Sequence, residues 1–220
     1  MSRPLISLWP RTVSVAVLLT VLAGCSALPA PPKAVVRYDL GAAPLTLQPA
    51  APASRMPVAL ADMQTPLQAE GSIAVHYRLM HAEPQVLHAY TQARWSLPPG
   101  QMVQQRLREH LGAEGRPVLS AEAGLLPPSV QGKQVPVLRL SLEEFSHVFT
   151  DATHSEGRVR VRATLVDPAP QGDVLLAQRM LESRQPAAAA NAAAGVQALS
   201  AGVDDVGQQL TQWLQSVPQP

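Results

Sequence analysis

The sequence predicts an α/β (α+β) fold in which a mixed, largely antiparallel sheet carries two principal helices. Residues 135–145 and 157–167 alternate apolar and polar side chains with the period of two that is typical of half-buried strands. After residue 186, apolar residues instead recur at steps of three and four, which places them on one face of a helix. Strands and helices of this kind indicate a single α+β domain.

Length, charge and cysteine content narrow the possibilities. Removal of residues 1–24 from the 220 leaves 196, which is enough for one domain with a good core. Those 24 residues hold two of the 17 basic residues and none of the 16 acidic ones, so the remainder has a net charge of −1. This balance argues against a nucleic-acid partner. Cys25 is the only cysteine, so no disulfide can form within the chain.

The sequence pattern in the first part of the domain predicts short strands separated by loops. Residues 35–40 and 56–61 are expected to be strands. Residues 41–57, which are rich in Pro and Ala, are expected to be a loop between the two strands. Residues 72–79 alternate in the manner of a half-buried strand. No element is predicted for residues 84–95.

A helix is predicted to begin at Gly100, directly after Pro98-Pro99. Apolar side chains recur every fourth residue from Val103 to Leu111, and Gly112 is the expected C-cap. This helix should cover one face of the sheet. Trp95 and Trp213 are expected in the core, with a place in an interface as the alternative.

The three clearest strands are predicted to be consecutive in the sheet. Residues 168–172 are rich in turn formers, so residues 173–182 should return antiparallel to residues 157–167. Arg158, Arg160 and Arg162 share one side of the middle strand. They form either a solvated face or a contact surface for lipid headgroups or an acidic protein patch. On an edge strand, such charges would also oppose aggregation.

The C-terminal helix is predicted to end before Pro218. Gly195, Gly202 and Gly207 each cost roughly 1 kcal/mol relative to Ala inside a helix, so we expect the helix to depend on packing against the sheet. A self-associating coiled coil is the alternative. The apolar stripe comprises Val196, Leu199, Val203, Val206, Leu210, Trp213 and Val217.

No catalytic motif is found: there is no Gly-x-Ser-x-Gly, no phosphate-binding Gly-rich loop and no His-Glu-x-x-His. His147, Asp151 and His154 share a segment that is interpreted as a polar turn, with a metal site as the alternative. Ser155 beside His154 and Asp151 offers a weak hydrolase arrangement. Glu143-Glu144 should point to opposite faces of a strand. The other histidines, each isolated, are His76, His81, His88 and His110.

The N-terminus has the features of a secretory signal. Arg3 and Arg11 are followed by the apolar residues 12–21, a run too short to span a bilayer, which takes roughly 20 residues. The residues that follow resemble a bacterial lipobox, in which the cysteine receives diacylglycerol and an N-acyl chain and becomes the first residue of the mature protein. An ordinary signal peptide with an incidental cysteine is the alternative. The lipobox comprises Leu22, Ala23, Gly24 and Cys25.

Residues 25–34 are expected to be a lipidated, Pro-rich tether to a single periplasmic domain at residues 35–217. At about 3.1 Å per residue, the extended segment 26–33 reaches on the order of 25 Å, so the domain should work close to its membrane. Ser26 follows the cysteine where an Asp commonly retains lipoproteins at the inner membrane. We therefore expect delivery to the periplasmic face of the outer membrane, with the inner membrane as the alternative.

Several segments together resemble the ABC-type transport auxiliary lipoproteins of the PqiC type. The resemblance implies a lipid-anchored periplasmic domain without enzymatic activity, cofactor or metal. It also implies membrane attachment, with an MCE-domain protein and ABC transporter subunits as partners in moving phospholipid between membranes; homo-oligomers are permitted. A structural or assembly lipoprotein of the outer membrane is the alternative. The segments are the lipobox, Tyr38 to Gly41, Tyr90 to Leu111, Leu138 to Thr164, and Ala198 to Leu214.

Overall fold

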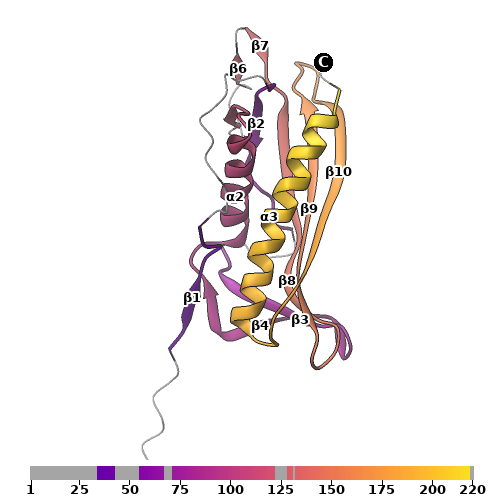
Figure 1. Ribbon diagram of the computed structural model, residues 1–220. Coiled ribbons are helices and arrows are strands. Elements are labelled where there is room, and N and C mark those ends of the chain that lie inside the picture. Colours follow the sequence, from indigo (N-terminus) through magenta and orange to yellow (C-terminus); the bar gives the residue numbers. More distant parts are fainter. Residues whose placement is uncertain (1–33, 43–54, 67–70, 122–127, 131, 219–220) are drawn as a thin grey trace, which may run out of the picture. The chain divides into compact units, whose positions relative to one another are not determined.

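Three long antiparallel strands form the frame of the protein in a computed structural model (Figure 1): β8 (Val137–Phe149), β9 (Ser155–Asp167) and β10 (Val174–Pro186). β9 pairs with β8 on one side and with β10 on the other over nearly its whole length. The predicted run of three consecutive strands is confirmed. The structure describes residues 34–42, 55–66, 71–121, 128–130 and 132–218.

Further strands extend this frame beyond the other edge of β8. One part of that edge pairs in parallel with β2 and another part with β3, so two strands share it. The sheet order is β1-β4-β3-β8-β2-β5, with β9 and β10 beyond β8, and β6 and β7 form a separate pair. Long antiparallel and short parallel pairings confirm the predicted mixed sheet. The remaining strands are β1 (Val36–Tyr38), β2 (Val58–Ala61), β3 (Ala74–Leu79), β4 (Glu83–Trp95), β5 (Val118–Ala121), β6 (Ser129–Val130) and β7 (Lys133–Gln134).

Two helices lie side by side in front of the sheet, as Figure 1 shows: α2 (Pro99–Ala113) and α3 (Ala192–Ser216). α3 packs along β8, β9 and β10 and also against α2. No helix within the described ranges is both long and apolar enough to cross a membrane.

The helix ends follow ordinary capping chemistry, with one difference from expectation. Asn191 caps α3 by accepting a hydrogen bond from the backbone N–H of Ala194 at 3.0 Å. Gly112 was predicted as the C-cap of α2, but this is wrong. The helix continues to Ala113, and the chain turns at Gly115, whose φ of 76° is accessible to glycine at little cost.

The glycines of α3 bring the helix close to its neighbours. A Cβ on Gly195 would lie 2.4 Å from the His147 ring, and one on Gly202 would lie 2.8 Å from Val159. On the sheet side, a Cβ on Gly157 would lie 2.5 Å from the backbone of Ala198 and Leu199. Packing against the sheet therefore accounts for glycines that weaken the isolated helix.

The apolar stripe of α3 is buried within the domain. Its residues Val203, Val206 and Leu210 are completely buried in the main core. The coiled-coil alternative is therefore wrong, because no continuous stripe is left for a second helix. Trp95 and Trp213, only 1% and 6% exposed, are core residues as predicted.

The structure differs from three expectations, which concern the position of His147, the direction of Glu143 and Glu144, and the arginines of β9. β8 extends to Phe149, so His147 lies in a strand and not in a turn. A β-bulge between Leu142 and Glu144 adds one residue opposite β9, which turns Glu143 and Glu144 toward the same outer face. The prediction that they point to opposite faces is wrong. β9 is an internal strand, so its arginines do not protect an edge.

Candidate functional site

The three arginines of β9 face outward on the side of the sheet opposite the helices, where carboxylates surround them. Arg158 pairs with Glu156 at 2.7 Å, and Arg162 pairs with Glu143 at 3.0 Å. Arg160 lies in register between Glu144 of β8 and Glu182 of β10. Because of this compensation, the stripe is a mixed-charge face and presents no strong cationic patch.

The turn between β8 and β9 brings together only part of the predicted hydrolase arrangement. The carboxylate of Asp151 lies 2.9 Å from Nδ1 of His154. Backbone N–H groups of Thr153 and His154 donate to the same carboxylate and lower the pKa of Asp151. Ser155, however, is 9% exposed and its hydroxyl has no hydrogen-bond partner within the described residues. Ser155 is therefore not paired with this base; the hydroxyl that lies beside it is that of Thr153, at 3.1 Å from Nδ1 of His154.

The metal-site interpretation of this segment also lacks support. His147 is buried under α3, whereas Asp151 and His154 lie in an exposed turn, so the three do not converge. Across the described part of the chain, no three His, Cys, Asp or Glu side chains gather as metal ligands.

His147 belongs to an aromatic cluster beneath the start of α3. Its Nδ1 lies 2.8 Å from the hydroxyl of Tyr90, and its ring centroid lies 4.4 Å from that of Phe149. Burial lowers the pKa of His147 to about 4 and raises that of Tyr90. The fold therefore stabilises the neutral form of the His147 imidazole.

We expect stability to fall below neutral pH because of His147. Its pKa is 6.5 when exposed and about 4 in the fold, so its contribution is complete above pH 6.5 and is lost as the pH falls toward 4. The full effect is on the order of 3 kcal/mol. Urea denaturation at several pH values should show that the free energy of unfolding depends less steeply on pH in His147→Gln than in wild type. His81→Gln, an exposed control, should keep the wild-type slope. An unchanged slope in His147→Gln would contradict this role.

A second buried polar group, which we call the N-terminal clamp, consists of Arg106 and His110 of α2 with Ser200 and Asp204 of α3. Arg106 is 4% exposed. Its Nη1 donates to Asp204 at 2.9 Å, and its Nη2 donates to the carbonyl of Leu40 at 2.9 Å.

Two further contacts complete the clamp. His110 Nε2 lies 3.0 Å from the same Asp204 oxygen, and Ser200 Oγ donates to Leu40 at 2.6 Å. The chain just after β1 is therefore held by both helices. The clamp was missed in the sequence, although Met102, Arg106 and His110 form a second row with a spacing of four beside the apolar row of α2.

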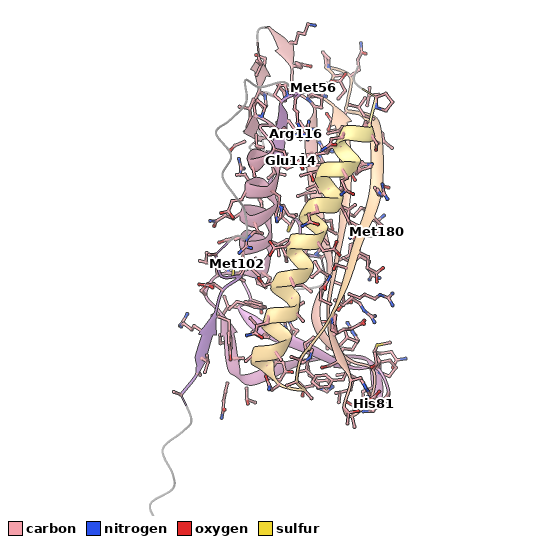
Figure 2. All side chains as sticks on the ribbon, viewed as in Figure 1. Met56, His81, Met102, Glu114, Arg116 and Met180 are labelled. Carbon is pink, nitrogen blue, oxygen red and sulfur yellow. The ribbon has the colours of Figure 1, made fainter. Side chains whose placement is uncertain are left out.

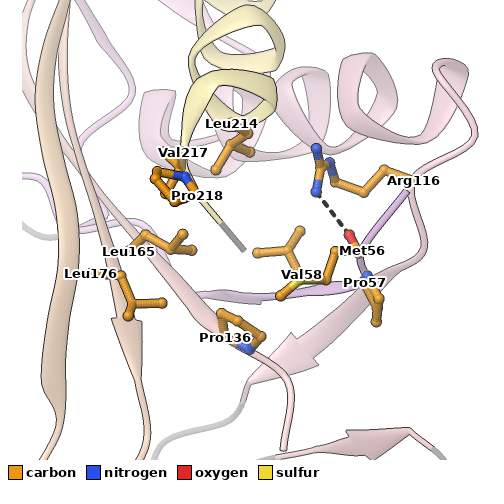
Figure 3. A pocket seen from close by; sticks show the side chains of 10 residues that line it. All are labelled: Met56, Pro57, Val58, Arg116, Pro136, Leu165, Leu176, Leu214, Val217 and Pro218. Atoms are coloured by element: carbon orange, nitrogen blue, oxygen red, sulfur yellow. Dashed lines mark hydrogen bonds between the residues drawn. The ribbon is translucent and has the colours of Figure 1, made fainter. Parts of the chain in front are cut away.

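A small cavity, which we call the apolar hollow, opens at the end of the domain where α3 terminates. Its volume is about 30 Å³. The start of β2, the end of β9, the start of β10 and the end of α3 surround it, as Figure 3 shows. Among the described residues that line it, Arg116 is the only charged one. The lining consists of Met56, Pro57, Val58, Arg116, Pro136, Leu165, Leu176, Leu214, Val217 and Pro218.

Arg116 has an unusual environment for a cation. Its Nη1 donates to the carbonyl of Met56 at 2.8 Å. Burial, reinforced by the nearby guanidinium of Arg55, lowers the pKa of Arg116, and Glu114 opposes the shift. Glu114 forms an ion pair with Arg55 and accepts a hydrogen bond from Gln215 at 2.9 Å. Its carboxylate is therefore already engaged.

The two ends of the domain differ in character. Figure 2 shows Met56, Glu114 and Arg116 together near the end of α3, with His81 at the opposite end. The 25 residues of α3 span about 37 Å between these ends. The chain enters the domain through β1, nearer the end where α3 begins, as Figure 1 shows.

These features define an α+β domain with a clamped entry strand and an apolar hollow at the end where α3 terminates. The chain belongs to the ABC-type transport auxiliary lipoprotein component family, whose model matches residues 38–211. The resemblance noted in the sequence is thereby confirmed. Membership makes the chain an auxiliary lipoprotein component of ABC-type transport in the cell envelope.

Solved structures share the fold at low sequence identity. A DUF330-family protein from Xanthomonas campestris is 18% identical, with a TM-score of 0.64 over 81% of this chain and 94% of that chain. A hypothetical protein from Chlamydia trachomatis is 8% identical, with a TM-score of 0.50 over 74% of this chain and 98% of that chain. At these identities the likeness extends to the fold alone. No curated protein matches the sequence.

Proposed function

We propose that this protein is a lipid-anchored, non-enzymatic docking component of an ABC/MCE-type system that moves phospholipid between membranes. The observation that carries the proposal is the family match across residues 38–211. Acyl chains on Cys25 would hold the domain at the periplasmic face of the outer membrane. Two or three such chains give stable attachment, whereas one gives only marginal binding. The proposed lipobox and tether lie outside the described residues.

The structure supports a docking role in two ways. The buried clamp of Arg106 and Asp204 ties the entry of the chain to both helices, so the domain can act as one body on its tether. The apolar hollow lies near the far end of α3, where a partner would have access to it. We assign no catalytic role to any residue, since Ser155, the candidate nucleophile, has no hydrogen bond to the acid and base of the 151–154 turn within the described residues.

Fractionation combined with affinity purification tests the proposal. Tagged wild-type protein should be recovered with membranes together with the MCE-domain protein and the transporter subunits. Cys25→Ser should appear in the soluble periplasmic fraction, because it lacks the acceptor for the acyl chains. Ser26→Ala, which keeps the cysteine, is the matched control and should remain in membranes.

Two outcomes would count against different parts of the proposal. Equal membrane recovery of Cys25→Ser and wild type would refute the lipid anchor. Membrane-bound wild type without any transporter subunit would refute the transport role and favour an assembly lipoprotein of the outer membrane.

A further inference from the structure

The apolar hollow continues onto an exposed apolar surface. Leu176 lines the hollow, and Val174 of β10, which pairs with Asp167 on the same face of the sheet as the lining residue Leu165, is 53% exposed. Contiguous exposed apolar side chains on a soluble domain mark interaction surfaces more often than isolated ones do. This end of the domain therefore has the character of a binding surface.

The charge at the hollow indicates the chemistry of what binds. Arg116 is half-buried and bonds to a backbone carbonyl, and no carboxylate of the described residues lies within ion-pair distance of it. A partly desolvated cation of this kind is costly when it lacks a counter-ion. A carboxylate supplied from outside would form a charge-assisted hydrogen bond with the guanidinium.

The size of the hollow indicates what kind of apolar group enters. Its volume of about 30 Å³ is roughly a tenth of that of the smaller pockets that hold drug-sized ligands, about 300 Å³. It admits the tip of one branched side chain and is far too small for an acyl chain of a lipid. A protein segment therefore fits this surface better than a lipid does.

We propose that the apolar hollow, with Val174 beside it, docks a segment of a protein partner that carries an apolar anchor beside a carboxylate. The anchor side chain enters the hollow and the carboxylate meets Arg116. This inference rests on the proposed function for the identity of the partner, which would be a protein subunit of the transport assembly.

A pair of peptides that differ by one charge tests the inference. The full-length lipidated protein, labelled at Leu and Val methyl groups and held in nanodiscs, is titrated with acetyl-Gly-Leu-Asp-Leu-Gly-amide or with its Asn counterpart. The Asp peptide should shift the signals of Leu176, Leu214 and Val217 and should bind about fivefold tighter than the Asn peptide. Absence of shifts at these three residues would overturn the inference.

Variants separate the charge from the apolar contact. Arg116→Gln should remove the preference for Asp over Asn. Arg139→Gln, an exposed arginine paired with Asp173, is the matched control and should keep it. Val174→Ser should weaken both peptides alike. A thermal melt of each variant confirms that it is folded. A preference for Asp that survives Arg116→Gln would overturn the inference, and so would decanoate binding at the same signals as tightly as the peptide.

The outcome for the inference is distinguishable from that for the proposed function. Peptide binding at the hollow, with no MCE-domain protein or transporter subunit in the affinity purification, would refute the proposed function and leave the inference standing. Co-purification of those subunits, undiminished by Arg116→Gln and Val174→Ser together, would refute the inference and leave the proposed function standing.

Discussion

Replacing Gly157 by alanine should lower the free energy of unfolding by about 3 kcal/mol, because β9 has no room there for a side chain. A Cβ at this position would lie 2.5 Å from the backbone of both Ala198 and Leu199 in α3. Backbone atoms cannot rotate away as a flexible side chain can, so α3 would have to move off the sheet. Chemical denaturation followed by Trp fluorescence measures the loss.

Gly112→Ala is the matched control for this prediction. Gly112 is exposed in α2, and a Cβ there would meet nothing within 4 Å. Alanine favours a helix over glycine, so this variant should be neutral or more stable by up to about 1 kcal/mol. Equal stability of Gly157→Ala and Gly112→Ala would show that α3 does not lie so close to β9.

Asp204→Ala should lower the free energy of unfolding by about 3 kcal/mol, since it leaves a buried cation without its counter-ion. Arg106 is 4% exposed, and the carboxylate of Asp204, 17% exposed, lies 2.9 Å from its guanidinium. His110 loses the same partner. Urea denaturation measures the stability, and limited trypsin digestion should show faster cleavage at Arg37 as the segment around Leu40 loosens.

Glu109→Ala provides the control on the same guanidinium. Glu109 lies 3.6 Å from Arg106, but its side chain is 40% exposed. Exposed ion pairs contribute roughly 0–1 kcal/mol, so this variant should differ little from wild type. If Asp204→Ala cost no more than Glu109→Ala, the clamp would have no structural importance.

The elements with long, regular patterns were predictable from the sequence. β8, β9 and α3 each repeat their apolar residues over ten or more positions, and β10 follows from the turn formers before it. The structure has all four. β4 was missed, because it lies toward one edge of the sheet and most of its side chains are exposed or half-buried. The four residues of β5 are too few to show a period.

The candidate sites depend on contacts that local patterns do not contain. The lining of the apolar hollow comes from positions as far apart as Met56 and Pro218. β8 was expected to end at residue 145, because the polar Ser146 and His147 follow. His147 is nevertheless buried, since Tyr90 supplies a hydrogen bond and Gly195 leaves space for the ring. Both partners are distant in sequence.

The N-terminal clamp has a mechanical consequence for a protein that hangs from its anchor. Tension arriving along the chain would first load β1, whose three residues pair only with β4 among the described strands and would yield early. It would then reach Leu40, where Arg106 and Ser200 grip the carbonyl from two different helices. The contacts of Leu40 with Arg106 and Ser200 would therefore resist the tension longest. β1 could detach from β4 under load while the core stays folded.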